Sequence, residues 1–84
     1  MMYGVNNYLD ISTLHIKEVT LKNSSQYKLC EYDTGAIFWV PDDNFFISDD
    51  LRIVFEYARN NNCSLIRFDA EGFQFPELPE YDWE

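Results

Sequence analysis

Apolar side chains recur at helical spacing just after residue 48, at offsets that place them on one helix face with polar residues opposite. They are Leu51, Val54, Phe55 and Ala58. Ser48 is a candidate N-cap, and Asp49 and Asp50 suit the positive end of the helix dipole. Three asparagines at 60–62 can satisfy terminal carbonyls or adopt the left-handed conformation that closes a helix. The pattern therefore predicts an amphipathic helix that starts after Ser48 and ends in these asparagines.

Four segments have the alternation or the short apolar runs typical of strands: residues 8–11, 27–32, 36–40 and 65–69. The run at 36–40 is unbroken and ends at Pro41, a pattern expected of a central strand covered on both faces. With the first strand, it is predicted to form the middle of the sheet. Asp33-Thr34-Gly35 predicts a turn before it, and Ala70-Glu71-Gly72 predicts a turn into a short returning segment at 73–75.

Residues 14–23 fit neither period well. A helix would place Leu14 and Leu21 on one side but Ile16 and Val19 on another, and a strand would break its alternation in the middle. We favour a helix here. The chain then reads strand, helix, strand, strand, helix, strand.

This βαββαβ order predicts a small α+β domain that takes in the whole chain, residues 1–84. A ferredoxin-like arrangement, with both helices on one face of an antiparallel sheet, fits the order, and a related meander fits it nearly as well. The prolines of residues 76–84 forbid a regular helix or an interior strand, so this acidic segment is predicted to be an extended tail.

Charge and composition limit the partners. The chain has six Lys and Arg against fifteen Asp and Glu, a net charge of −9, which repels nucleic acid and anionic lipid. A basic protein is the natural complement. Two cysteines without metal-ligand spacing, no leader pattern at the N-terminus and no apolar run of membrane-spanning length indicate a cytoplasmic protein with no membrane association.

Three groups of motifs resemble a family of short, uncharacterised bacterial proteins that are often encoded on plasmids, phages and genomic islands. They are Ile11-Ser12-Thr13-Leu14-His15-Ile16; Asp50-Leu51 with Ala58-Arg59, Asn62-Cys63 and Phe68-Asp69; and Leu78-Pro79 with Tyr81-Asp82-Trp83. The resemblance implies a helix after the first motif and a mobile-element setting, in which small acidic proteins are frequently inhibitors or immunity factors. Relatives commonly place Gly where this chain has Asn62, so the chain departs from the family there, although Asn can adopt the same backbone conformation.

Three sets of side chains are candidates for chemistry, and each has a structural explanation. Asp33-Thr34-Gly35-Ala36 coincides with the aspartic protease motif, but polar residues precede it and a hairpin turn accounts for it. His15 beside Ser12 and Thr13 resembles a base with nucleophiles, yet capping hydroxyls and a hydrogen-bonded histidine explain the three residues better. The carboxylates at 42–50 lack the offsets of a calcium-binding loop. We therefore expect no enzyme activity, no cofactor and no bound metal.

The acidic residues are segregated. Six acids and no base lie between Lys28 and Arg52, and six more acids follow Arg67. If the loop at 41–50 lies near the C-terminal tail, the two form one negative surface with aromatic residues among its carboxylates, which suits a basic protein partner. The predicted partner-binding residues are Asp42, Asp43, Phe45, Phe46, Glu80, Tyr81, Asp82 and Trp83. Acidity that serves only solubility is the competing explanation.

Ile53 and Tyr57 widen the apolar arc of the predicted helix beyond what one sheet normally covers. Either tail residues such as Leu78 and Trp83 or a second copy of the chain are expected to pack there, so a homodimer through Ile53 and Tyr57 is one alternative. The favoured function is a protein that binds and blocks a basic, nucleic-acid-handling partner, of the antirestriction, anti-CRISPR or immunity type. The alternative is a dimeric structural or regulatory accessory protein of a mobile element, with no inhibitory role.

Overall fold

Four strands form one mixed sheet in the order β1-β4-β3-β2. The computed structural model describes residues 7–41 and 48–81. Along the chain the elements are β1 (Tyr8–Ser12), a 3-10 turn η1 (Thr13–His15), α1 (Glu18–Asn23), β2 (Lys28–Tyr32), β3 (Gly35–Trp39), α2 (Asp49–Asn60) and β4 (Leu65–Asp69). The predicted α+β class and βαββαβ order are confirmed.

The position of β4 differs from the prediction. β1 pairs in parallel with β4 along their whole length, from Tyr8 opposite Leu65 to Ser12 opposite Asp69, while β3 is antiparallel to both β4 and β2. The sheet is therefore mixed, not antiparallel, and β1 lies at its edge. The expectation that β1 and β3 form the middle is confirmed for β3, which lies between β4 and β2, but is wrong for β1. The second central strand is β4, with Ile66 and Phe68 fully buried, and it lies between β1 and β3.

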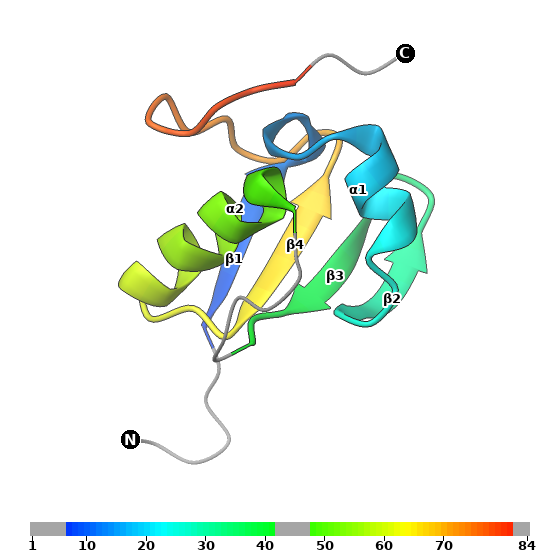
Figure 1. The fold of residues 1–84 in the computed structure, drawn as a ribbon, viewed down its shortest axis with the longest axis horizontal. Coiled ribbons are helices and arrows are strands. Elements are labelled where there is room, and N and C mark those ends of the chain that lie inside the picture. Colours follow the sequence, from blue (N-terminus) through cyan, green and yellow to red (C-terminus); the bar gives the residue numbers. More distant parts are fainter. Residues whose placement is uncertain (1–6, 42–47, 82–84) are drawn as a thin grey trace.

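Both helices cover one face of the sheet, with α2 in front of β1 and β4 and α1 toward β3 and β2 (Figure 1). The sheet side chains on this face alternate as strand geometry requires, and the buried ones are Leu9, Ile11, Ala36, Phe38, Ile66 and Phe68. The predicted apolar face of α2 is buried against them, which confirms the helical periodicity. Each large side chain buried here contributes roughly 1.5–3 kcal/mol of stabilisation.

The opposite face of the sheet is not covered by any helix of the described residues. Ile37 is only half-buried, and it lines a surface hollow together with Tyr8, Leu65 and Arg67. The prediction that residues 36–40 form a strand covered on both faces is therefore wrong. The apolar run reflects one buried face, at Ala36 and Phe38, and a second face that stays apolar while facing outward.

The ends of α2 follow the predicted signals in part. Ser48 occupies the N-cap position, but its side chain makes no capping hydrogen bond to the helix. At the other end, the side-chain Nδ2 of Asn61 donates to the carbonyl oxygen of Tyr57 at 2.8 Å, and Asn62 has a φ of 59°. Both roles predicted for the asparagines are thus found, the first at Asn61 and the second at Asn62.

Residues 14–23 form two short elements, not one helix. The Ser12 hydroxyl accepts a hydrogen bond from the Leu14 amide and caps η1, after which the backbone at Ile16 and Lys17 is extended. α1 starts directly after Lys17, whose backbone amide donates a hydrogen bond to the Asp50 carboxylate at 2.8 Å. The break explains the poor periodicity of this segment, since the two halves belong to elements with different directions.

Candidate functional site

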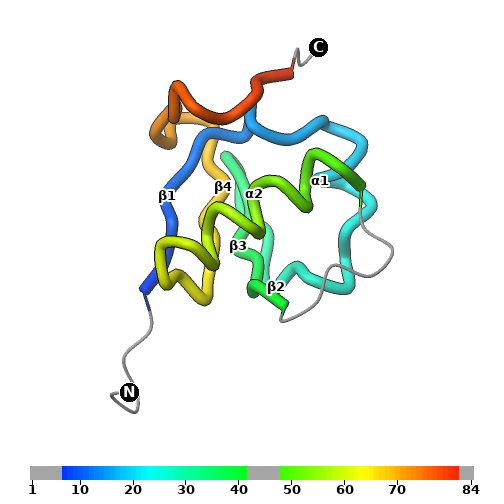
Figure 2. Tube along the Cα trace, turned by 60° about the vertical axis from the view of Figure 1, so that its left-hand side comes forward, coloured from blue at the N-terminus to red at the C-terminus, as the bar shows by residue number. Residues whose placement is uncertain are grey.

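A group of long-range polar contacts lies at the end of the sheet where β1 and β4 finish and β3 begins. The segment at 70–81 crosses this end, above η1, as both views show (Figures 1 and 2). A hydrogen bond from the Ser12 amide to the carbonyl oxygen of Phe73 (2.9 Å) joins it to β1. The C-terminal segment is thereby placed over the sheet end.

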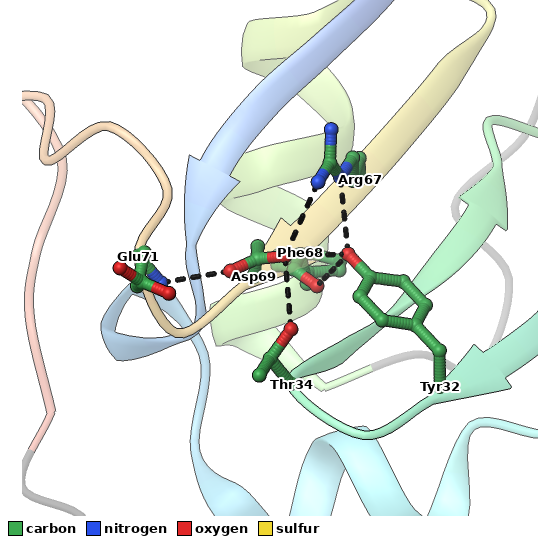
Figure 3. A network of polar contacts seen from close by, with 6 residues as sticks. All are labelled: Tyr32, Thr34, Arg67, Phe68, Asp69 and Glu71. Atoms are coloured by element: carbon green, nitrogen blue, oxygen red, sulfur yellow. Dashed lines mark hydrogen bonds and ion pairs between the residues drawn. The ribbon is translucent and has the colours of Figure 1, made fainter.

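Asp69, the last residue of β4, lies at the centre of a polar network (Figure 3). Its Oδ2 accepts hydrogen bonds from the hydroxyls of Tyr32 (2.9 Å) and Thr34 (3.1 Å). The Arg67 guanidinium lies 3.4 Å from the same oxygen, and the Glu71 amide donates to Oδ1 at 2.8 Å. One carboxylate therefore joins β2, the β2–β3 turn, β4 and the turn that follows it.

The contacts of the network set the ionisation of its members. The hydrogen bond from the Glu71 amide, with that from the Tyr32 hydroxyl, lowers the pKa of Asp69 below its ordinary value. Burial raises the pKa of Tyr32, which keeps the phenol a donor. The pKa of Arg67 is raised by its hydrogen bond to Tyr32 and by the charge of Asp10. Asp69 is thus held as a carboxylate and the other two as donors.

The network is suited to holding the fold together. Both oxygens of Asp69 accept hydrogen bonds from groups of the chain itself, and Asp69 is 7% exposed, so little of it faces solvent. Among residues 7–41 and 48–81, no group of three or more His, Cys, Asp or Glu is arranged to hold a metal ion. Sequence reasoning missed this network. The available signal was Arg67 two residues before Asp69, which places both side chains on one face of a strand.

His15 is the second centre of contacts and is fully buried. Its Nδ1 lies 2.8 Å from the carbonyl oxygen of Pro79, and its Nε2 accepts the amide of Phe75 at 2.9 Å. Because a carbonyl only accepts and an amide N–H only donates, the proton of the neutral ring is on Nδ1. The interpretation of His15 as a hydrogen-bonded histidine beside a capping Ser12 is confirmed.

The C-terminal segment is fastened at further points. Leu78 is buried in the core cluster, and the Tyr81 amide donates to the carbonyl oxygen of Leu14 at 2.7 Å. Tyr57 of α2 meets this segment as well, through a ring contact with Phe75 and a hydrogen bond from its hydroxyl to Glu77 (3.0 Å). The C-terminal segment therefore packs on Tyr57, one of the two residues that widen the apolar arc of α2. The other, Ile53, is half-buried against the core.

Few of the predicted partner-binding residues fall in the described part of the chain. Glu80 is exposed, and Tyr81 is half-buried with Lys17 Nζ 5.5 Å from its ring centroid. Since the Lys17 amide is also bound by Asp50, the start of α2 and the C-terminal segment lie close together at this point. The remaining six lie outside the described residues: Asp42, Asp43, Phe45, Phe46, Asp82 and Trp83.

Replacing Asp50 with asparagine is expected to lower stability by about 1–2 kcal/mol at pH 7 and to flatten its acid dependence. Burial alone would raise the pKa of Asp50, but hydrogen bonds from the Lys17 amide and from the Ser48 and Thr20 hydroxyls lower it below 3.8 overall. The native protein then binds fewer protons than the unfolded chain below about pH 4, so stability falls as the pH drops through the folded-state pKa.

Urea unfolding between about pH 2.5 and 7 measures this dependence. Asp49→Asn is the matched control, because Asp49 lies in the same helical turn and is exposed beside Arg52. The Asp50 variant should lose part of the acid slope that the control keeps. Equal slopes in the wild type and both variants would contradict the prediction.

The fold and these contacts define a small α+β domain whose C-terminal segment is integrated into its core. Residues 8–83 match the C-terminal domain of a family of unknown function, DUF5983, so the chain belongs to that family. Comparison with curated proteins and with solved structures finds no match. None of the helices in the described residues has the length and apolar character needed to cross a bilayer.

Proposed function

We propose that this protein is a non-enzymatic binding protein of a mobile genetic element, which binds a basic, nucleic-acid-handling protein and blocks it, as an antirestriction, anti-CRISPR or immunity factor does. The observation that carries the proposal is the distribution of charge over the described surface. Basic side chains are engaged within the chain, whereas one acidic region is left without ion pairs. A cytoplasmic location belongs to the proposal and agrees with two free cysteines, Cys30 and Cys63.

All six basic side chains contact their own chain. Four of them form ion pairs: Lys22, Lys28, Arg52 and Arg67. Arg59 donates to the carbonyl oxygen of Pro41 at 2.7 Å, and Lys17 lies over the ring of Tyr81. Ion pairs at the surface add little stability, but they neutralise carboxylates locally. The excess of negative charge therefore concentrates where such pairs are missing.

One region of the described residues combines carboxylates without ion pairs, and we call it the acidic end. Its members are Asp33, Glu71, Glu77 and Glu80. A hydrogen bond from the Ala70 amide to the carbonyl oxygen of Thr34 (2.8 Å) brings the β2–β3 turn beside the C-terminal segment that carries the other three. Phe73, 61% exposed, lies among them and supplies an apolar contact.

This combination suits the capture of a basic protein surface. Negative charge accelerates encounter with a positive partner over roughly a Debye length, about 10 Å at 0.1 M salt. Exposed aromatic side chains then supply the contact area that slows dissociation. Blocking by occupancy would be stoichiometric, since it needs one copy of this protein for each partner.

Affinity capture from a bacterial lysate, with the full chain as bait, tests the proposal. A basic protein should be retained at about 50 mM salt and largely released at about 300 mM, because screening weakens the attraction. Neutralising two exposed carboxylates of the acidic end, as Glu71→Gln with Glu80→Gln, should reduce capture by about tenfold.

The control is Gln26→Lys with Asn60→Lys, which also raises the net charge by two but at exposed positions outside the acidic end. This control should capture nearly as much partner as the wild type. Failure to retain any basic protein, or equal loss in both variants, would rule the proposal out.

A further inference from the structure

We propose that the face of the sheet that no helix of residues 7–41 and 48–81 covers (Figure 1) binds the same face of a second copy of this chain. The side chains that carry the argument come from three adjacent strands, and we call them the open face: Tyr8 and Asp10 of β1, Leu65 and Arg67 of β4, and Ile37 of β3. This association is separate from the proposed binding of a basic protein, because it uses the open face and not the acidic end.

Shape is the first argument. Tyr8, Ile37, Leu65 and Arg67 line a hollow of about 180 Å³. An apolar cavity of about 150 Å³ is large enough for benzene, so the hollow accommodates one aromatic ring. Tyr8 itself is 57% exposed at its rim. An exposed ring beside a ring-sized hollow on one surface suits a two-fold interface, since each copy offers both to the other.

Charge is the second argument. Two chains of net charge −9 repel each other over most orientations. The open face carries less negative charge than the rest of the surface. Arg67 is the register partner of Asp10 and pairs with Asp69, whose side chain is only 10% exposed, and three apolar side chains lie beside them. A basic partner gains little from a surface with so little net charge, whereas the repulsion between two acidic chains is weaker where two such faces meet. The charge pattern therefore favours a second copy over a basic protein.

Area sets the strength. With strands about 4.8 Å apart and a rise of about 3.3 Å per residue, four strands of five residues present roughly 300 Å² in plan. Side chains make the accessible area of each face larger than its area in plan, but two such faces still bury less than the roughly 1,600 Å² of a standard stable interface. We therefore expect a weak dimer with a dissociation constant of about 10 µM to 1 mM.

Sedimentation equilibrium of the full chain between about 10 µM and 1 mM tests this. The average mass should rise from one chain toward two, and the dimer should be stronger at about 300 mM salt than at 50 mM, because salt screens the repulsion between the two acidic chains. The expected salt response is opposite to that of the proposed basic partner, so the two proposals fail independently.

Single lysine substitutions locate the interface. Tyr8→Lys and Ile37→Lys should each weaken the dimer by about tenfold or more, by placing two equal charges in a desolvated contact. Val19→Lys is the control, with the same charge change at a side chain of α1 that is 58% exposed. It should leave the dimer within about twofold of the wild type. Circular dichroism establishes that each variant is folded.

Three results would overturn the inference. One is a monomer at every concentration and salt, which means that the open face does not bind a second copy. Another is a dimer that Ile37→Lys leaves intact while Tyr8→Lys dissociates it, which places the contact at the β1 edge. The third is a chain that stays monomeric while Tyr8→Lys abolishes capture of a basic protein, which assigns the face to that partner.

Discussion

Replacing Gly35 with alanine is expected to destabilise the protein by about 3 kcal/mol or more, at or beyond the upper end of the usual cost of overpacking. A Cβ at this position would lie 1.7 Å from the carbonyl oxygen of Phe68 and 2.9 Å from the Cα of Asp69. These are backbone atoms of the central strand β4, so no side-chain rotation relieves the clash. Either β3 separates from β4 or the Asp69 network at that point is distorted.

Thermal unfolding followed by circular dichroism measures the effect, and a loss of this size corresponds to a drop in Tm of about 12 °C or more. The control is Asp33→Ala, two residues earlier in the same hairpin, where the side chain is exposed. It should change stability by no more than about 0.5 kcal/mol. A Gly35→Ala protein that melts within a few degrees of the wild type would show that β3 does not approach β4 this closely.

The Gly35 case shows what sequence reasoning can and cannot supply. The Asp-Thr-Gly pattern correctly predicted a chain reversal, but the turn itself is Asp33-Thr34, and Gly35 is the first residue of β3. The glycine is required by the approach of another strand 33 residues away in the sequence, and no local pattern reports such a neighbour. Helix α2 was predictable because its periodicity and its closing asparagines act within the helix.

The sheet order was not predictable for the same reason. Alternation indicates that a segment is a strand and which residues share a face, but not which strand lies beside it. The parallel pairing of β1 with β4 joins residues 57 positions apart, as at Tyr8 and Leu65. Short connections favour β1 near β3, but in the structure β4, with Ile66 and Phe68 fully buried, lies between them.

The sequence predicted the chemical character of the candidate surface but not which residues form it. Charge segregation along the chain identified acidity with aromatic residues as its chemistry, and Glu80 remains exposed. Asp33 and Glu71 were not predicted to share one region, because the contact between the residues beside them, Thr34 and Ala70, spans 36 positions. Long-range hydrogen bonds of this kind assemble the acidic end, and composition alone does not contain them.

His15→Ala is expected to cost about 2–4 kcal/mol, because it removes two hydrogen bonds of a fully buried ring and opens a cavity where the ring was. The two hydrogen bonds of the ring join residues 60 and 64 positions away, at Phe75 and Pro79. Their loss should release the C-terminal segment from η1. The amide of Phe75 should then exchange its hydrogen with solvent much faster. Core amides such as that of Phe68 should lose protection only by the amount that the global loss of stability accounts for.

Two further variants separate the contributions of the ring nitrogens. His15→Gln can place an acceptor near Nε2 and keep the Phe75 amide bonded, whereas His15→Asn can place a donor near Nδ1 and keep the Pro79 carbonyl bonded. Hydrogen exchange followed by NMR should therefore find the Phe75 amide more protected in the glutamine variant than in the asparagine variant. Equal protection in both, or unchanged exchange in His15→Ala, would mean that His15 does not fasten this segment. The two variants differ in this test because each keeps only one of the two hydrogen bonds, whereas the neutral imidazole, with its proton on Nδ1, makes both.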